Sequence, residues 1–131
     1  MTKEEQHAQL VALCQSALIE CGGALPDDWQ KLVLCGSVEG GSAGMFGYAF
    51  DAAGDFHATS PRGGNTLDRL EALHEAMAQG GERPWLALQL VIAVTGMFHV
   101  AFEYDNPQRW KVSSANLEAR IAEFAALPMP Q

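Results

Sequence analysis

Four side chains are of the types that acid–base or metal chemistry uses: Asp55, His57, His99 and Glu103. Imidazoles and carboxylates transfer protons near neutral pH and bind first-row transition metals. The four would meet only if the two hairpins that carry them were neighbours in a sheet. Their spacing is also the ordinary alternation of a strand's polar face, which favours a solvated or partner-facing surface. We therefore predict no catalytic residue, no metal site and no cofactor.

Cysteine and glycine patterns offer no stronger site. Cys14, Cys21 and Cys35 form no Cys-x-x-Cys pair, and burial of Cys35 in an apolar segment would raise its pKa and blunt its reactivity. The stretch Gly40–Gly44 lacks the lysine and the following helix of a phosphate-binding loop. Gly63-Gly64 does precede a predicted helix, where capping by Asn65 or Thr66 is favoured over anion binding.

Carboxylates gather instead on predicted turns and strand ends, with an aromatic residue beside them. Such a negative patch steers a basic protein and raises its association rate, while an aromatic side chain can anchor the interface. A merely solvated acidic surface is the alternative. The candidate partner-binding residues are Glu39, Asp51, Asp55, Glu103, Asp105 and Trp110.

Composition limits the classes of function. The chain has 131 residues, 48% of them hydrophobic, which predicts one ordered domain over residues 1–131. Eight Lys and Arg face sixteen Asp and Glu, a formal net charge of −8. This charge argues against binding to nucleic acid or to an anionic membrane. With no secretory signal and no membrane-spanning stretch in the sequence, and with an odd number of cysteines, we expect a cytoplasmic protein.

Periodicity predicts three helices. The first covers residues 2–21, with Thr2 and Glu5 as a capping box and Gly22-Gly23 as its end. The second begins at Asn65 or Thr66 and ends before Gly80, and the third runs from about residue 114 to Pro128.

Five apolar or alternating segments predict strands, over residues 32–35, 45–51, 56–60, 85–94 and 97–104. Residues 40–44 are expected to be a flexible break between the first two strands. The short turns favour antiparallel pairing. The expected fold is a two-layer α+β domain in which three helices pack on a roughly five-stranded, mainly antiparallel sheet, in the order α-β-β-β-α-β-β-α.

Several short motifs resemble one family. The order of these motifs along most of the chain is similar to that in the YezG-type immunity proteins of bacterial polymorphic toxin systems. The motifs are Leu25-Pro26-Asp27-Asp28-Trp29, the strand that Trp85 begins, Thr95-Gly96-Met97-Phe98 and Phe102-Glu103-Tyr104-Asp105.

The resemblance implies a cytoplasmic antitoxin that neutralises a cognate toxin domain, often a nuclease, by stoichiometric binding and without chemistry of its own. Two other functions stay open. One is a small-ligand protein or enzyme that uses the neighbourhood of His57 and His99. The other is a homodimeric adaptor whose exposed apolar strand, residues 85–94, is the association surface.

Overall fold

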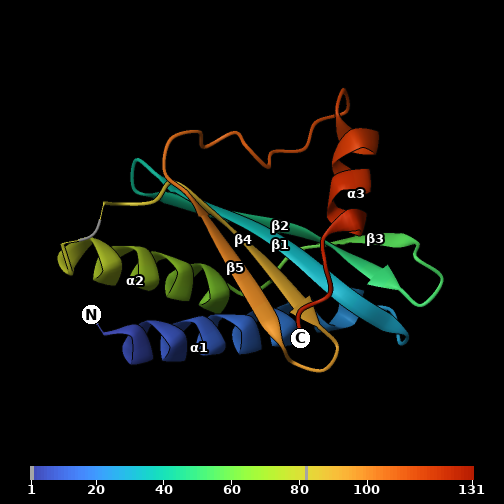
Figure 1. Ribbon diagram of the computed structural model, residues 1–131, viewed down its shortest axis with the longest axis horizontal. Coiled ribbons are helices and arrows are strands. Elements are labelled where there is room, and N and C mark those ends of the chain that lie inside the picture. The colour runs from blue at the N-terminus through green and yellow to red at the C-terminus, as the bar shows by residue number, and fades with distance from the viewer. Residues whose placement is uncertain (1, 82) are drawn as a thin grey trace.

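The computed structural model describes residues 2–81 and 83–131 and has the predicted α+β fold (Figure 1). Three helices and a five-stranded antiparallel sheet follow one another in the order α-β-β-β-α-β-β-α. The elements are α1 Lys3–Cys21, the short helix η1 Gly22–Ala24, β1 Trp29–Glu39, β2 Ser42–Asp51, β3 Phe56–Thr59, α2 Asn65–Gln79, β4 Ala87–Ala93, β5 Phe98–Glu103 and α3 Leu117–Ala126.

The strands lie in the order β3-β2-β1-β4-β5, so β1 is central and β3 and β5 are the two edges. The pairing of β1 with β2 continues to Glu39 opposite Ser42, across a turn of only two residues. Gly40 and Gly41 have φ values of +54° and +83°, the left-handed conformation that a two-residue hairpin turn of this kind requires. The prediction of a flexible break over residues 40–44 is therefore wrong for residues 42–44, which belong to β2, and only Gly40 and Gly41 interrupt the strands.

Helices α1 and α2 lie together on one face of the sheet, and α3 lies on the other (Figure 1). The side chains between the sheet and α1 and α2 are almost wholly apolar and form the larger core, which includes Leu13, Leu32, Leu34, Leu70, Leu88 and Ile92. As the alternation of residues 97–104 predicts, Phe98, Val100, Phe102 and Tyr104 pack against this core. They are only partly buried because β5 is an edge strand.

The start of α2 differs from its prediction. Gly64 is the N-cap residue, and neither Asn65 nor Thr66 caps the helix with its side chain. Instead, the Glu20 carboxylate of α1 accepts hydrogen bonds from the backbone N–H groups of Asn65 and Thr66, at 3.1 and 2.9 Å. A buried hydrogen bond of 2.8 Å between the hydroxyls of Ser16 and Thr66 joins the same two helices. Helix α2 is thus capped by a neighbouring helix, which local sequence does not reveal.

The opposite face of the sheet carries a second, smaller core around Val33, Val91, Trp110 and Phe124. Every residue of β4 is buried, since β1 and β5 flank the strand and side chains cover both of its faces. The prediction that residues 85–94 expose an apolar association surface is therefore wrong for this strand. In the part of the chain that the structure describes, no helix has the length and apolar character needed to cross a membrane.

Candidate functional site

The proposed histidine cluster does not form. His57 lies on β3 and His99 on β5, at opposite edges of the sheet. Four interstrand spacings of about 4.8 Å lie between these edges, a distance of about 19 Å. Their register partners, Ala49 and Val91, belong to different cores, so the two imidazoles also lie on opposite faces. Among residues 2–81 and 83–131, no group of three or more His, Cys, Asp or Glu side chains could hold a metal ion.

Asp51 organises the β2–β3 turn. One carboxylate oxygen accepts hydrogen bonds from the N–H groups of Ala53 and Asp55, each at 3.0 Å, and the other lies 2.8 Å from His57 Nε2. The hydrogen bond from His57, followed by those from the turn, lowers the pKa of Asp51. Asp55 at the same turn is exposed. Asp51 therefore fixes the turn, and Asp55 is the carboxylate that the turn presents to solvent.

Glu103 has the corresponding role after β5. Its carboxylate accepts hydrogen bonds from the N–H groups of Asp105 and Asn106, at 3.0 and 3.1 Å, and from the Arg109 guanidinium at 3.0 Å. Together these bonds lower the pKa of Glu103 to about 2. Asp105 forms an ion pair with Arg83. Both predicted interface acids thus already have basic partners, contrary to the expectation of a patch with few basic residues.

Trp110 is not an exposed anchor. Its side chain is buried in the second core, with the Arg109 guanidinium 5.0 Å from the centre of its ring. A tryptophan next to charged residues in the sequence is typical of the edge of a core as well as of an interface. In this structure Trp110 belongs to the edge of the core. Glu39 is exposed at the β1–β2 turn.

The predicted acidic residues fall at two ends of the sheet. Asp51 pairs with Trp29 at the start of β1, whereas Glu39 ends β1, about 33 Å away along the strand. Glu103 lies at the Glu39 end, because it pairs with Ala87, which pairs with Ser37. One continuous acidic patch over all the predicted residues is therefore excluded.

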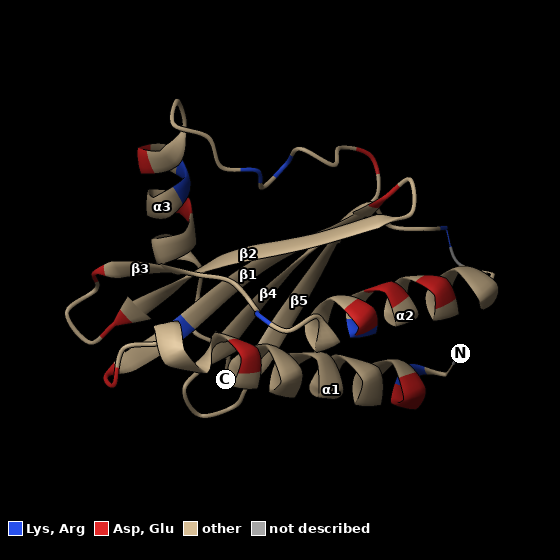
Figure 2. Ribbon diagram, turned by 180° about the vertical axis from the view of Figure 1, so that it is seen from behind, with Lys and Arg blue, Asp and Glu red and all other residues tan. Residues whose placement is uncertain are grey.

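The other end, at the β2–β3 turn, combines carboxylates with exposed apolar side chains. Asp27 and Asp28 precede β1 there, and the β4–β5 turn is held beside them by the hydrogen bond from Val94 N–H to the Gln30 carbonyl. Figure 2 shows that acidic residues, coloured red along the ribbon, occupy both the β2–β3 turn and the loop before β1 at this same end. We call this surface the hairpin end; it comprises Asp27, Asp28, Asp55, Phe56, Val94 and Met97.

The apolar members of the hairpin end are unusually open. Phe56 is 47% exposed, Val94 50% and Met97 49%. The sequence places Phe56 and Met97 within strands without indicating that they are exposed, and it places Val94 at the end of the apolar run that only the homodimer alternative treats as exposed. Their position at or next to turns between strands was the signal that could have indicated exposure. Which turns lie side by side, however, depends on the strand order.

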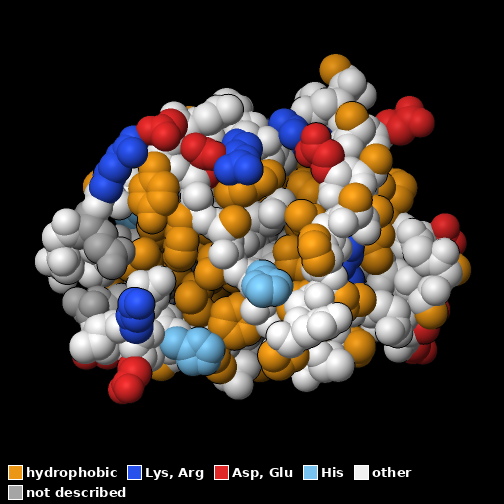
Figure 3. All heavy atoms as spheres, viewed as in Figure 1, with side chains coloured by type: hydrophobic (Ala, Val, Ile, Leu, Met, Phe, Trp, Pro, Cys, Tyr) orange, Lys and Arg blue, Asp and Glu red, His pale blue; other side chains and the backbone are white. Residues whose placement is uncertain are grey.

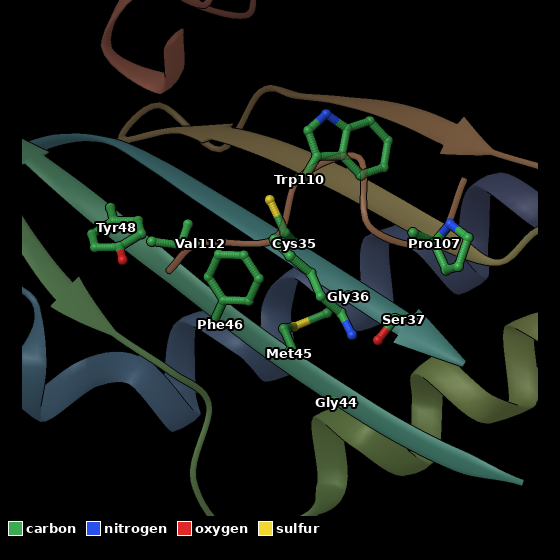
Figure 4. A pocket seen from close by; sticks show the side chains of 12 residues that line it. Cys35, Gly36, Ser37, Gly44, Met45, Phe46, Tyr48, Pro107, Trp110 and Val112 are labelled. Carbon is green, nitrogen blue, oxygen red and sulfur yellow. The ribbon is translucent and has the colours of Figure 1, made fainter. Parts of the chain in front are cut away.

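A pocket of about 450 Å³ lies between the smaller core and the segment that follows β5 (Figure 4). Met45, Phe46 and Tyr48 of β2 line one side, and Trp110 and Val112 line the other. The pocket can hold an apolar group of modest size. Cys35 also lines it, but burial raises the pKa of that thiol to about 12, so it is not a nucleophile at neutral pH.

The remaining thiols are also shielded by burial. Cys14 and Cys21 are buried and unpaired, and burial raises the pKa of both, that of Cys14 to about 12.

Comparison with known proteins identifies no family for this chain. No family model matches it, and no curated protein matches it.

Proposed function

We propose that this protein is a cytoplasmic immunity protein that binds a basic toxin domain, a nuclease in the first instance, through the hairpin end. One observation carries the proposal: exposed carboxylates and exposed apolar side chains share this end of the sheet. Apolar side chains surrounded by charges are the composition of a protein-binding surface, in which the apolar groups supply affinity and the charges supply orientation.

Charge supports a basic partner. Asp27, Asp28 and Asp55 are exposed and, among the described residues, form no ion pair with Lys or Arg. The net charge of −8 adds a long-range attraction for any cationic surface. A nuclease that holds phosphate presents such a surface, and an acidic inhibitor placed over it excludes the nucleic acid.

The geometry supports binding without chemistry by this chain. The two turns and the loop before β1 are anchored on the paired ends of β1, β2 and β4, so the interface is preorganised on a sheet. From β3 to β5 it spans about 19 Å, a width that fits an interface burying about 800 Å² on each partner. A preorganised surface loses little conformational entropy when it binds.

The direct test measures binding of the purified chain to the products encoded beside it, among which the proposal expects a basic toxin domain. The variant Asp27→Asn/Asp28→Asn/Asp55→Asn removes three charges from the hairpin end. We expect its association rate at low salt to fall by about tenfold or more. The matched control, Glu4→Gln/Glu71→Gln/Glu75→Gln, removes three exposed charges from the helix layer and should change the rate much less. Equal effects of both variants would show that only net charge matters and would remove the interface from the hairpin end.

Growth rescue tests the function itself. Where a neighbouring product proves toxic on expression, co-expression of this chain should restore growth, and co-expression of the variant Phe56→Asp/Met97→Asp should not. Both side chains are half exposed, so the variant should fold normally. If no neighbouring product is toxic, the proposed function is wrong. If this variant still rescues growth, the hairpin end is not the interface.

The pocket in Figure 4 supports a second candidate, a small-ligand protein. Its apolar lining and volume of about 450 Å³ suit a compact apolar molecule. Binding of the fluorescent probe anilinonaphthalene sulfonate, weakened by Val112→Trp, would favour this function. Absence of binding would leave the pocket as a packing defect of the smaller core.

A further inference from the structure

The outer edge of β5 has the features of a strand that pairs with another strand. It is six residues long and ends the sheet, with a regular register against β4. Natural edge strands are commonly protected by lysine, proline, a bulge or shortness. The opposite edge, β3, has only four residues, whereas β5 has none of these protections. Its one charged residue, Glu103, is already bound to Arg109 and the following turn.

The backbone groups that are free can be identified from the ladder. Ala93 N–H donates to the Met97 carbonyl, and hydrogen-bonded pairs alternate along an antiparallel ladder. In β5 the residues that bond to β4 are therefore His99, Ala101 and Glu103. The N–H and C=O groups of Phe98, Val100 and Phe102 point away from the sheet.

Apolar side chains accompany these free groups. Phe98, Val100 and Phe102 are only partly buried against the larger core. Strand β5 lies in front in Figure 1, and the space-filling view from the same side shows hydrophobic side chains gathered along it (Figure 3). A strand added here would gain backbone hydrogen bonds and complete the burial of these side chains.

We propose that β5 pairs antiparallel with β5 of a second copy of this chain, about a two-fold axis at Val100. This register alone brings all three outward-facing residues into hydrogen-bonded pairs: Val100 with Val100 of the second copy, and Phe98 with Phe102 in both directions. Pairing in this way is isologous and closes the edge, giving a ten-stranded sheet.

The register also suits the surroundings of the strand. A hollow of about 520 Å³ lined by Gln6, Met77, Arg83, Phe102 and Tyr104 lies beside Phe102, where the second copy's Phe98 would be placed. Glu103 of one copy would face Met97 of the other, so the two carboxylates lie about 20 Å apart, six strand residues of about 3.3 Å each. The inference does not rest on the proposed function: the dimer pairs the backbone of Phe98, Val100 and Phe102, and of the hairpin end only Met97 borders this register.

Sedimentation of the purified chain over a concentration series tests the proposal. We expect a reversible dimer with a Kd of about 10–100 µM, as befits a small interface. Val100→Pro removes an outward N–H, leaves the β4 ladder intact and should weaken the dimer by about tenfold or more. The matched control is Ala58→Pro on β3, whose N–H also points outward because Asp51 N–H donates to the Asp55 carbonyl. It should leave the dimer unchanged.

Cross-linking tests the register even if Val100→Pro folds poorly. The two-fold axis places His99 opposite Ala101 of the second copy, in a pair with Cα atoms about 4.5 Å apart, within disulfide range. A mixture of His99→Cys and Ala101→Cys proteins should therefore form covalent dimers far faster than either protein alone. The native cysteines are buried and will not compete.

Two results would overturn the proposal. One is a chain that stays monomeric throughout the series, and the other is a dimer that survives Val100→Pro and gives no cross-link in the mixture. If the chain is monomeric and Val100→Pro abolishes toxin binding, the edge receives a strand of the toxin rather than a second copy.

Discussion

At the scale of single residues, two glycines of β2 that look alike in the sequence have opposite constraints. A Cβ atom at Gly47 would lie 2.4 Å from the Val33 carbonyl oxygen, while nothing lies within 4 Å of one at Gly44. We expect Gly47→Ala to destabilise the fold by about 1–3 kcal/mol through overpacking. Gly44→Ala should be neutral or slightly stabilising. Urea unfolding of both variants checks this, and equal midpoints would contradict the close approach of β1 and β2.

Glu103 should contribute to the pH dependence of stability. Its pKa is about 2 in the folded protein against an ordinary value of 4.5, so the unfolded chain binds its proton first as the pH falls. The contribution is therefore complete above about pH 5 and is lost as the pH decreases towards 2. Urea midpoints measured from pH 6 to pH 2 should fall more steeply for the native protein than for Glu103→Gln. Parallel curves would mean that the bonds to Arg109 and the turn do not hold this carboxylate.

The surroundings of Asp51, Glu103 and Trp110 show which properties of a predicted site residue the sequence reveals and which it does not. Residue type and position correctly placed both acids at strand ends. Both acids accept hydrogen bonds from backbone N–H groups of the turns. Which N–H groups are available depends on the backbone conformation of each turn, which the sequence does not reveal. Burial of Trp110 likewise depends on the segment after β5 folding back over β1 and β4, a long-range contact.

At the scale of elements, α3 is held on the sheet by apolar packing and by a lysine of β1. Phe124 is buried in the smaller core, and the Lys31 ammonium donates to the carbonyls of Phe124, Ala125 and Leu127, each at 2.9 Å. Lysine here satisfies and neutralises the carbonyl end of the helix.

We expect Lys31→Met to destabilise α3 by about 1–3 kcal/mol, since carbonyls lose their donor while the aliphatic stem is kept. Hydrogen exchange should accelerate in residues 117–126 and remain slow in β1 and β4. Lys111→Met, an exposed cation on the same side of the sheet, serves as the control. Uniform acceleration over the whole chain would show that α3 does not open independently.

Elements were predictable where local rules decide them. Thr2 accepts the hydrogen bond from Glu5 N–H, and α1 ends before the two glycines as the sequence predicts. The cap of α2 could not be predicted, because Glu20 is 45 residues away in sequence from Asn65. The extension of β1 and β2 through polar and glycine residues follows from mutual pairing, which a search for apolar runs does not detect.

At the scale of the whole molecule, strand order decides which residues meet. Crossing from β3 to β4 through α2 places the second hairpin on the far side of β1. The same topology separates His57 from His99 and gathers the β2–β3 and β4–β5 turns at one end. Two hairpins of equal local pattern can be joined in several orders, and packing of the whole chain selects among them.

Net charge gives the two proposed interactions opposite responses to salt. Two copies of charge −8 repel, whereas the same charge attracts a basic toxin. Raising the ionic strength from about 0.05 to about 0.5 M shortens the screening length from about 14 to about 4 Å. Association with the toxin should therefore slow by about tenfold or more, and self-association through β5 should strengthen. Sedimentation and stopped-flow measurements on one preparation check both; a dimer that dissociates with salt would mean that ionic contacts, and not the edge of β5, hold the copies together.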